Sequence, residues 1–214
     1  MLQAAASGWS VLGRALWPPR CAFCGQQQLH PVCAPCRDDL PWLEPRFDLE
    51  PFAVAIAPLA YAFPVDAAIR RFKFHRRLAY GPAFAHLLRQ AAGLLPDDID
   101  AVLAVPLHWR RQARRGFNQA AEIARPICRR TGLPQLTGVS RSRSTPYQSG
   151  LSAGRRRQNL RNAFRLRGAA DYRHVLVIDD VITTGETCRQ VAKVLLEAGV
   201  PAVSALAIAR VAQD

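Results

Sequence analysis

The sequence predicts an α/β protein in which a mostly parallel sheet is flanked by helices, with a small cysteine-rich module at the N-terminus. Two observations favour the sheet. Apolar segments of strand length alternate with amphipathic segments through the C-terminal half, an order typical of right-handed crossovers between parallel strands. Residues 175–178 are apolar without interruption, as expected of a strand covered on both faces. Two CxxC pairs near the N-terminus indicate the separate module.

We predict two parts, residues 1–50 and residues 51–214, with the larger domain in the second. Residues 3–16 are fairly apolar, and their only charge, Arg14, lies at the wrong end for a secretory signal. We therefore expect a short helix packed on the body of the protein, with membrane targeting as the alternative. The proline-rich residues 41–51 are expected to form an extended connector.

The N-terminal module carries four cysteines with metal-ligand spacing, namely Cys21, Cys24, Cys33 and Cys36. A two-residue gap lets both sulfurs of a pair face one ion, and four sulfurs complete the tetrahedral shell of a structural zinc site. His30 lies between the pairs and is expected not to bind the metal. A redox pair is the alternative. Cys128 and Cys188 are expected to be inert thiols, so the cysteines fit a reducing cytoplasm.

The elements of the larger domain follow from their periodicity and their glycines. We expect a strand pair or hairpin edge first, then two helices, and then the alternation of strands and helices. The expected ranges are a strand pair at 53–62, helices at 66–74 and 84–95, a strand at 101–105, a helix at 118–131, a strand at 175–178, a helix at 186–198 and a strand at 202–211. No apolar run approaches the about 20 residues of a membrane span, so no integral membrane segment is expected.

A candidate phosphate loop follows the buried strand, which is predicted to end at Asp179 and Asp180. Free N–H groups at the start of the next helix favour an anion, and Gly185 lets the backbone approach it closely. Because carboxylates repel phosphate, the two acids suit sugar hydroxyls or a bridging metal ion. A plain helix capped by Asp180 is the alternative. The candidate residues are Asp179, Asp180, Thr183, Thr184, Gly185, Glu186 and Thr187.

A second basic segment follows the strand at residues 101–105 and leads into the helix at residues 118–131. Two arginine pairs with a glycine before the helix suit a polyanion. Arg115, Asn118 and Gln119 are the candidate ligand contacts. A solvated basic turn with Asn118 as the helix cap is the alternative.

These motifs resemble those of known proteins. The two acids followed by Thr-Thr-Gly-x-Thr resemble the phosphoribosyl-diphosphate motif of type I phosphoribosyltransferases. Val-Pro-Leu at residues 105–107, Arg-Gly-Phe-Asn-Gln-Ala at residues 115–120 and Thr-Pro-Tyr-Gln at residues 145–148 resemble the ComF family of competence-associated proteins. The four-cysteine module fits the same family. The resemblance implies a type I phosphoribosyltransferase-like parallel sheet with a zinc-ribbon-like module.

The resemblance also implies roles for the candidate residues. Asp179 and Asp180 would hold the ribose of phosphoribosyl diphosphate, which binds with Mg²⁺, and the threonine loop would hold its 5′-phosphate. The protein would then be a transferase with an unknown acceptor, linked to DNA uptake. The alternative is a non-catalytic module that senses phosphoribosyl diphosphate or binds single-stranded DNA beside the DNA-uptake machinery.

The formal net charge of +13 favours an anionic partner, and its excess lies between Arg70 and Arg173. A genome that favours arginine codons is the alternative explanation. The basic residues 140–162 are expected either to close over a bound substrate or to contact nucleic acid.

Overall fold

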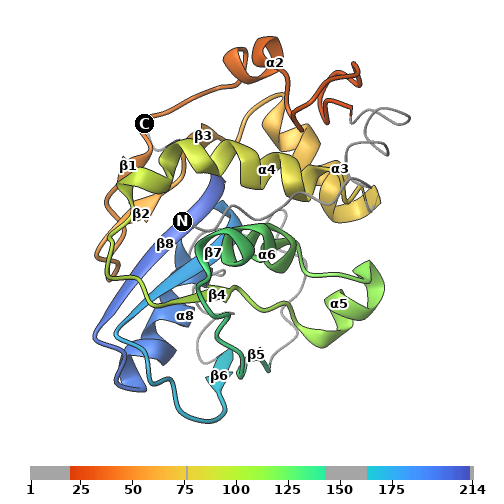
Figure 1. Ribbon diagram of the computed structural model, residues 1–214. Helices are drawn as coiled ribbons and strands as arrows, with labels where there is room; N and C mark the ends of the chain where they lie inside the picture. Colours follow the sequence, from red (N-terminus) through yellow and green to blue (C-terminus); the bar gives the residue numbers. More distant parts are fainter. Residues whose placement is uncertain (1–19, 76, 143–162, 213–214) are drawn as a thin grey trace, which may run out of the picture.

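Figure 1 shows the computed structural model, which describes residues 20–75, 77–142 and 163–212. The expected helix at residues 3–16 lies outside these ranges, as does most of the basic stretch at residues 140–162. Within the described ranges, no helix combines the length and the apolar character needed to cross a membrane.

A six-stranded sheet forms the centre of the molecule. Its order is β1 (Arg46–Phe47), β2 (Ala55–Ile56), β8 (Ala202–Arg210), β7 (His174–Ile182) and β4 (Ala101–Ala104), and β3 (Leu59–Ala60) also pairs with β8. Only β1 and β2 pair antiparallel, and the other pairs in this sheet are parallel. The predicted class, a mostly parallel sheet flanked by helices, is confirmed.

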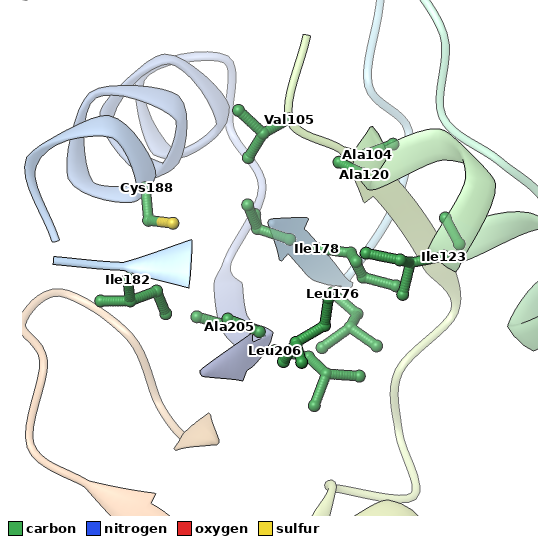
Figure 2. Packing of buried hydrophobic residues seen from close by; sticks show 14 of the residues in the cluster. Ala104, Val105, Ala120, Ile123, Leu176, Ile178, Ile182, Cys188, Ala205 and Leu206 are labelled. Atoms are coloured by element: carbon green, nitrogen blue, oxygen red, sulfur yellow. The ribbon is translucent and has the colours of Figure 1, made fainter. Parts of the chain in front are cut away.

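Helices cover both faces of this sheet (Figure 1). On one face lie α3 (Val65–His75), α4 (Tyr80–Leu88), the 3-10 turn η1 (Arg89–Leu94) and α6 (Gln119–Thr131), and on the other lies α8 (Glu186–Glu197). Figure 2 shows Leu176 and Ile178 of β7 near Ile123 of α6, with Cys188 of α8 on the other side of the strand. Because β7 is covered on both faces, its first five residues are all buried.

The helices are held by apolar faces with helical spacing. In α3 the buried residues Val65, Ala68, Ile69 and Phe72 recur at three- and four-residue intervals, which is the pattern of one face packed on a core. Phe72 also contacts Phe84 of α4, with ring centroids 5.8 Å apart. This packing fixes α3 against the sheet.

Residues 53–62 differ from the expected strand pair. β2 and β3 do not pair with each other, because both lie along the same edge of β8 in one continuous register, from Ala55 opposite Ala205 to Ala60 opposite Arg210. Pro58 separates them since it has no N–H to donate to the ladder. The hairpin prediction was therefore wrong, and this segment is one interrupted parallel strand.

Other elements were not predicted. A short helix, α5 (Trp109–Arg115), precedes α6, and another, α2 (Ala34–Asp38), begins at the second cysteine pair. β5 (Val139–Arg141) and β6 (Phe164–Leu166) form a separate two-stranded sheet. β1 lies inside the expected connector yet joins the central sheet, and the domain boundary after residue 50 stays a prediction.

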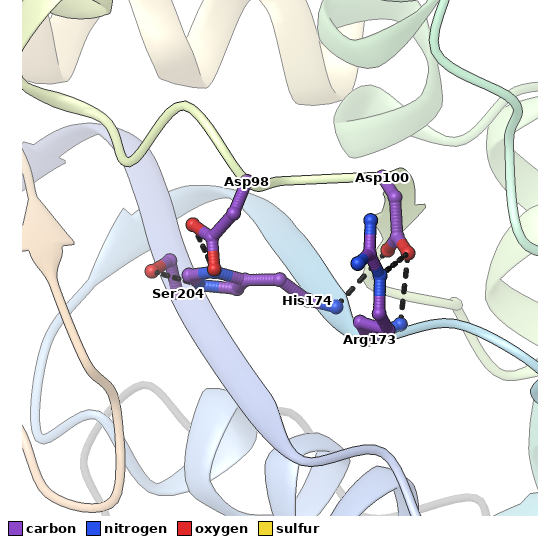
Figure 3. A network of polar contacts seen from close by, with 5 residues as sticks. All are labelled: Asp98, Asp100, Arg173, His174 and Ser204. Carbon is purple, nitrogen blue, oxygen red and sulfur yellow. Dashed lines mark hydrogen bonds and ion pairs between the residues drawn. The ribbon is translucent and has the colours of Figure 1, made fainter.

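A network of polar contacts fastens the amino-terminal end of β7 (Figure 3). The ring of His174 bonds Asp98 through Nδ1 at 2.9 Å and Ser204 of β8 through Nε2 at 2.9 Å. Asp100 accepts the backbone N–H groups of Arg173 and His174 at 2.9 and 3.0 Å. Ser204 is 0% exposed and His174 is 2% exposed, so this serine–histidine–aspartate set ties strands together and offers no nucleophile to solvent.

Candidate phosphate-binding site

The two acids lie on β7 where its pairing with β4 stops. The β4–β7 register ends with Ala104 opposite Ile178, and β7 continues beside β8 to Ile182. The strand is therefore longer than the expected residues 175–178, because β8 pairs with β7 along and beyond the acids. Asp179 and Asp180 thus stand at the edge left open by β4, near the carboxyl ends of the parallel strands, where α/β sheets bind ligands.

Asp180 is buried, and it pairs with a cation that sequence reasoning did not propose as a site residue. Its Oδ2 lies 2.8 Å from Nζ of Lys73 in α3. Burial acts to lower the pKa of Lys73, but the charge and hydrogen bond of Asp180, together with the charges of Asp179 and Tyr61, outweigh burial, so the pKa is raised. Lys73 is therefore an ammonium at neutral pH and holds one carboxylate of the pair.

Asp179 is partly exposed, and its side chain lies on the face of the sheet that α8 covers, opposite to the side chain of Asp180. Its Oδ1 accepts the backbone N–H of Asp180 at 2.8 Å, and its Oδ2 lies 3.9 Å from Sγ of the buried Cys188 in α8. Successive side chains of a strand point to opposite faces, which explains why the two acids reach different helices. Burial and the adjacent charge of Asp180 raise the pKa of Asp179 to about 7, despite the opposing charge of Lys73.

The threonine loop ends in a sharp turn at Gly185, the N-cap of α8. Gly185 has φ +76°, and a Cβ there would collide with Leu49, so glycine is required both by conformation and by space. Arg189 fastens the loop from behind, donating to the backbone oxygens of Thr184 at 2.6 Å and Glu50 at 2.9 Å. Gly185 has no side chain to cap α8. The N–H of Glu186 donates to Oγ1 of Thr184 in a long bond of 3.5 Å, which a stronger phosphate acceptor at the start of the helix could replace.

The loop residues predicted to hold the phosphate differ in which of their groups can reach a ligand. Thr183 is exposed, and Thr184 and Thr187 are partly exposed, so their hydroxyls can reach a ligand. Glu186 is 9% exposed, and its carboxylate accepts a bond from Gln190 at 2.9 Å. The side chain of Glu186 therefore faces its own helix, and only its backbone N–H, which donates to Oγ1 of Thr184 at 3.5 Å, lies at the helix start.

The second candidate loop is held next to the acids by Asn118. Its Oδ1 accepts the N–H of Ala120 at 3.0 Å as the cap of α6, and its Nδ2 donates to the carbonyl of Val105 at 3.0 Å. Val105 in turn donates its N–H to Ile178, just before the acids. Asn118 thus has a structural role of its own, as the alternative interpretation held, and it also brings the second loop to the first.

Arg115 and Gln119 are buried beside this cap. Nη1 of Arg115 donates to Oε1 of Gln119 at 3.0 Å, and its guanidinium lies over the ring of Phe74 at 5.1 Å. Gln119 is 2% exposed, and its Nε2 has no hydrogen-bond partner among the described residues. A buried donor without a partner costs roughly 1–3 kcal/mol, which a ligand oxygen would recover.

Arg141 of β5 is a further cation near the acids that was considered only as part of the basic stretch. It is buried, with its guanidinium 5.5 Å from the ring centroid of Phe164. Burial and the nearby charge of Arg111 lower its pKa to about 10, although Asp179 acts in the opposite sense. Neither Lys73 nor Arg141 could be identified as a site residue from sequence, because the fold brings each of them near the acids from a distant part of the chain.

The four cysteines converge as predicted. Their Sγ atoms all lie within 4.8 Å of one another, close enough to bind one zinc ion. Arg20 bridges to Gln27 across the first pair, and α2 begins directly after Cys33. The module touches the larger domain through Phe23, whose ring meets that of Tyr80 edge-on at 5.9 Å.

Comparison with known proteins identifies the family. Over 201 residues the chain is 35% identical to the DNA utilization protein YhgH of Escherichia coli strain K12, covering 89% of this chain and 83% of that protein. It is 38% identical over 162 residues to Competence protein F of Haemophilus influenzae, covering 70% of this chain and 69% of that one. The chain belongs to the ComF family. Competence protein ComFC of Bacillus subtilis is a more distant ComF relative, 26% identical over 188 residues.

Other comparisons add little to the ComF assignment. No protein-family model matches the sequence. A purine phosphoribosyltransferase from Pyrococcus horikoshii is 17% identical with a TM-score of 0.34, covering 65% of this chain and 73% of that structure. A likeness at that level supports no argument about the site.

Proposed function

We propose that this ComF protein binds phosphoribosyl diphosphate with Mg²⁺ at the end of β7 and acts in DNA uptake or utilization. One observation supports this ligand above the others: α8 begins at Gly185, a positive-φ glycine without a capping side chain, in the loop that follows the strand carrying the two adjacent acids. The names of the relatives, a DNA utilization protein and competence proteins, support the DNA-related role.

The 5′-phosphate would lie at the start of α8. The first-turn N–H groups and the positive end of the helix dipole favour a dianion there, and Thr183, Thr184 and Thr187 add hydroxyl donors. Gly185 removes the side chain that would otherwise meet Leu49 and distort this turn.

The ribose hydroxyls and Mg²⁺ would meet the acids. Asp179 is the more accessible of the two, and carboxylate oxygens are ligands that Mg²⁺ prefers. Lys73 already balances the charge of Asp180, so the negative charge offered to the metal would be that of Asp179 after release of its proton. When bound, Mg²⁺ would neutralise part of the diphosphate charge.

The diphosphate would face the second loop. Gln119 offers a buried donor without a partner in the described ranges, and Arg115 lies bonded beside it. In a transferase, fixing the ribose on the acids and the leaving diphosphate on this loop would supply positioning and charge stabilisation. If no acceptor is used, the same contacts would make the protein a sensor of its ligand.

Helix α5 favours a second candidate function, contact with single-stranded DNA. Trp109 is 64% exposed, and Arg110 lies over its ring at 5.2 Å. Arg114 is also exposed on this helix. An exposed aromatic ring among arginines suits base stacking with contacts to the phosphate backbone.

We also propose that the cysteine cluster holds one structural zinc ion, since four sulfurs leave no open position for chemistry. Metal analysis of protein purified without chelators should find one zinc per chain.

The primary test is calorimetric titration with phosphoribosyl diphosphate and Mg²⁺. Wild type should bind, Asp180→Asn should weaken binding by about ten-fold or more, and the exposed Asp171→Asn should not. Absence of binding by folded wild-type protein would refute the ligand. Diphosphate release measured across candidate acceptors then separates a transferase from a sensor.

A further inference from the structure

His30, which is not needed as a metal ligand, lies in a stacked pair. Its ring lies against that of His86 in α4, with centroids 5.6 Å apart and planes 20° apart. His30 comes from the loop between the two cysteine pairs, and Nε2 of Gln28 holds its carbonyl at 2.9 Å. His30 is exposed and His86 is partly exposed. The pair is therefore a flat aromatic surface, open to solvent, between the cysteine module and the larger domain.

This pair borders a pocket of about 570 Å³ between the module and helices α4 and α6. Three arginines line it, Arg89 after α4 and Arg129 and Arg130 at the end of α6, and no carboxylate is among its lining residues. In the part of the chain that the structure describes, none of these arginines forms an ion pair, whereas Arg125 on the same helix pairs with Glu122.

The helix dipole accounts for only part of this charge. Arginines in the last turn of α6 are favoured by its negative end, which explains Arg129 and Arg130. It does not explain Arg89, which another element brings to the same pocket. Burial, together with the charges of Arg89 and other nearby groups, lowers the pKa of His86, so the arginines supply the positive charge at neutral pH.

We propose that this pocket binds a nucleotide, with its phosphate on the three arginines and its base against the histidine pair. The volume lies within the range of roughly 300–1,000 Å³ typical of small-ligand sites. Arginines without acidic partners suit a phosphate, and a flat ring surface suits a base. The source is either a free nucleotide or one unit of a single strand.

This site is separate from the phosphate-binding site at β7 and goes beyond the proposed function. Asn118 caps α6 at the end near the acids, whereas Arg129 and Arg130 lie in its last turn. At about 1.5 Å per residue, the two ends of α6 are roughly 18 Å apart. Occupation of one site therefore does not require the other.

The test is titration of the zinc-loaded full chain with AMP and, separately, with a single-stranded oligothymidylate. Arg129→Ala combined with Arg130→Ala should weaken AMP binding about ten-fold or more, and His86→Ala should weaken it several-fold. Arg125→Ala is the matched control on α6. Asp180→Asn is the second control, because it disables the other site. Neither control should change AMP affinity.

The outcomes distinguish a free nucleotide from a single strand, and both of these from refutation of the proposal. If the oligothymidylate depends on the same residues and binds more tightly than AMP, the pocket is assigned to a strand. If the two ligands bind with equal affinity per site, it is assigned to a free nucleotide. The proposal is overturned if neither ligand binds, or if the arginine variants bind as wild type. It is also overturned if inorganic phosphate binds as tightly as AMP and His86→Ala has no effect. Loss of AMP binding in Asp180→Asn alone would assign that binding to the β7 site.

Discussion

At the scale of single residues, the charge of the candidate site depends on Asp179. Its pKa is raised to about 7 by burial and by Asp180, so the folded state holds this proton where the unfolded state has released it. The unfolding free energy of the ligand-free protein should therefore fall as pH rises between about 5 and 7, by at most about 1.4 kcal/mol per pH unit. Urea denaturation across this range should show that slope for wild type and a reduced one for Asp179→Asn. An identical slope in both proteins would contradict the assignment.

The ion pair of Lys73 and Asp180 gives a second test at this scale. Lys73→Met should leave a buried carboxylate without its cation and destabilise the protein by about 3–5 kcal/mol. Adding Asp180→Asn should restore much of that loss, because the uncompensated charge is gone. Thermal and urea unfolding of the two single variants and the double variant give the interaction free energy between the two side chains. Additive losses would show that the two side chains act independently.

Sequence reasoning found the residues of the site that are neighbours in the chain and missed those that are not. Asp179 to Thr187 form one continuous segment, so their order alone predicted an anion site after a strand. Lys73 reaches Asp180 only because α3 packs on the sheet, and no periodicity in α3 shows that contact. The structural use of Asn118 was considered from sequence, but its bond to Val105 depends on the fold.

Among the secondary-structure elements, α8 has a positive-φ glycine at each end, Gly185 at its start and Gly199 just after its last turn. A Cβ added at Gly185, which has φ +76°, would collide with Leu49. A Cβ added at Gly199, which has φ +92°, would have no atom within 4 Å. Gly199→Ala should cost about 1–2 kcal/mol from backbone conformation alone. Gly185→Ala should cost more and should also abolish binding of phosphoribosyl diphosphate, since Leu49 and the turn must move. Equal losses of stability, with ligand binding intact in both, would contradict the role given to the turn.

The helices and the inner strands were predictable because burial imposes a strong pattern on them. The edge of the sheet was less predictable. β2 and β3 are two residues each, and their pairing with β8 is set by the length of β8 and by Pro58 rather than by local preference. α5 was missed because its seven residues are almost all polar or basic, and it packs on no apolar face that a periodic pattern could indicate.

At the scale of the whole molecule, the cysteine module and the larger domain meet through aromatic rings. Phe23 contacts Tyr80, and His30 stacks on His86, so two residues of the module lie against α4. Trp42, just after the module, donates to the carbonyl of Arg37 at 2.8 Å and bridges to Leu59 of the sheet. Order in the module is therefore expected to influence the stability of α4.

Removal of the metal should test this coupling. A module this small has little core of its own, so metal binding supplies much of its folding free energy. Chelation of the zinc, or Cys24→Ala, should lower the melting temperature and increase hydrogen exchange in α4 as well as in the module, because Tyr80 and His86 lose their partners. Cys128→Ala is the control, since Cys128 lies outside the cluster. Hydrogen exchange in β7 and α8 should change little, because neither the pairing of β7 within the sheet nor the packing of α8 on it involves the module. If α4 exchanges as in the zinc-loaded protein while the module opens, the two parts are energetically independent, and the ring contacts do not transmit order between them.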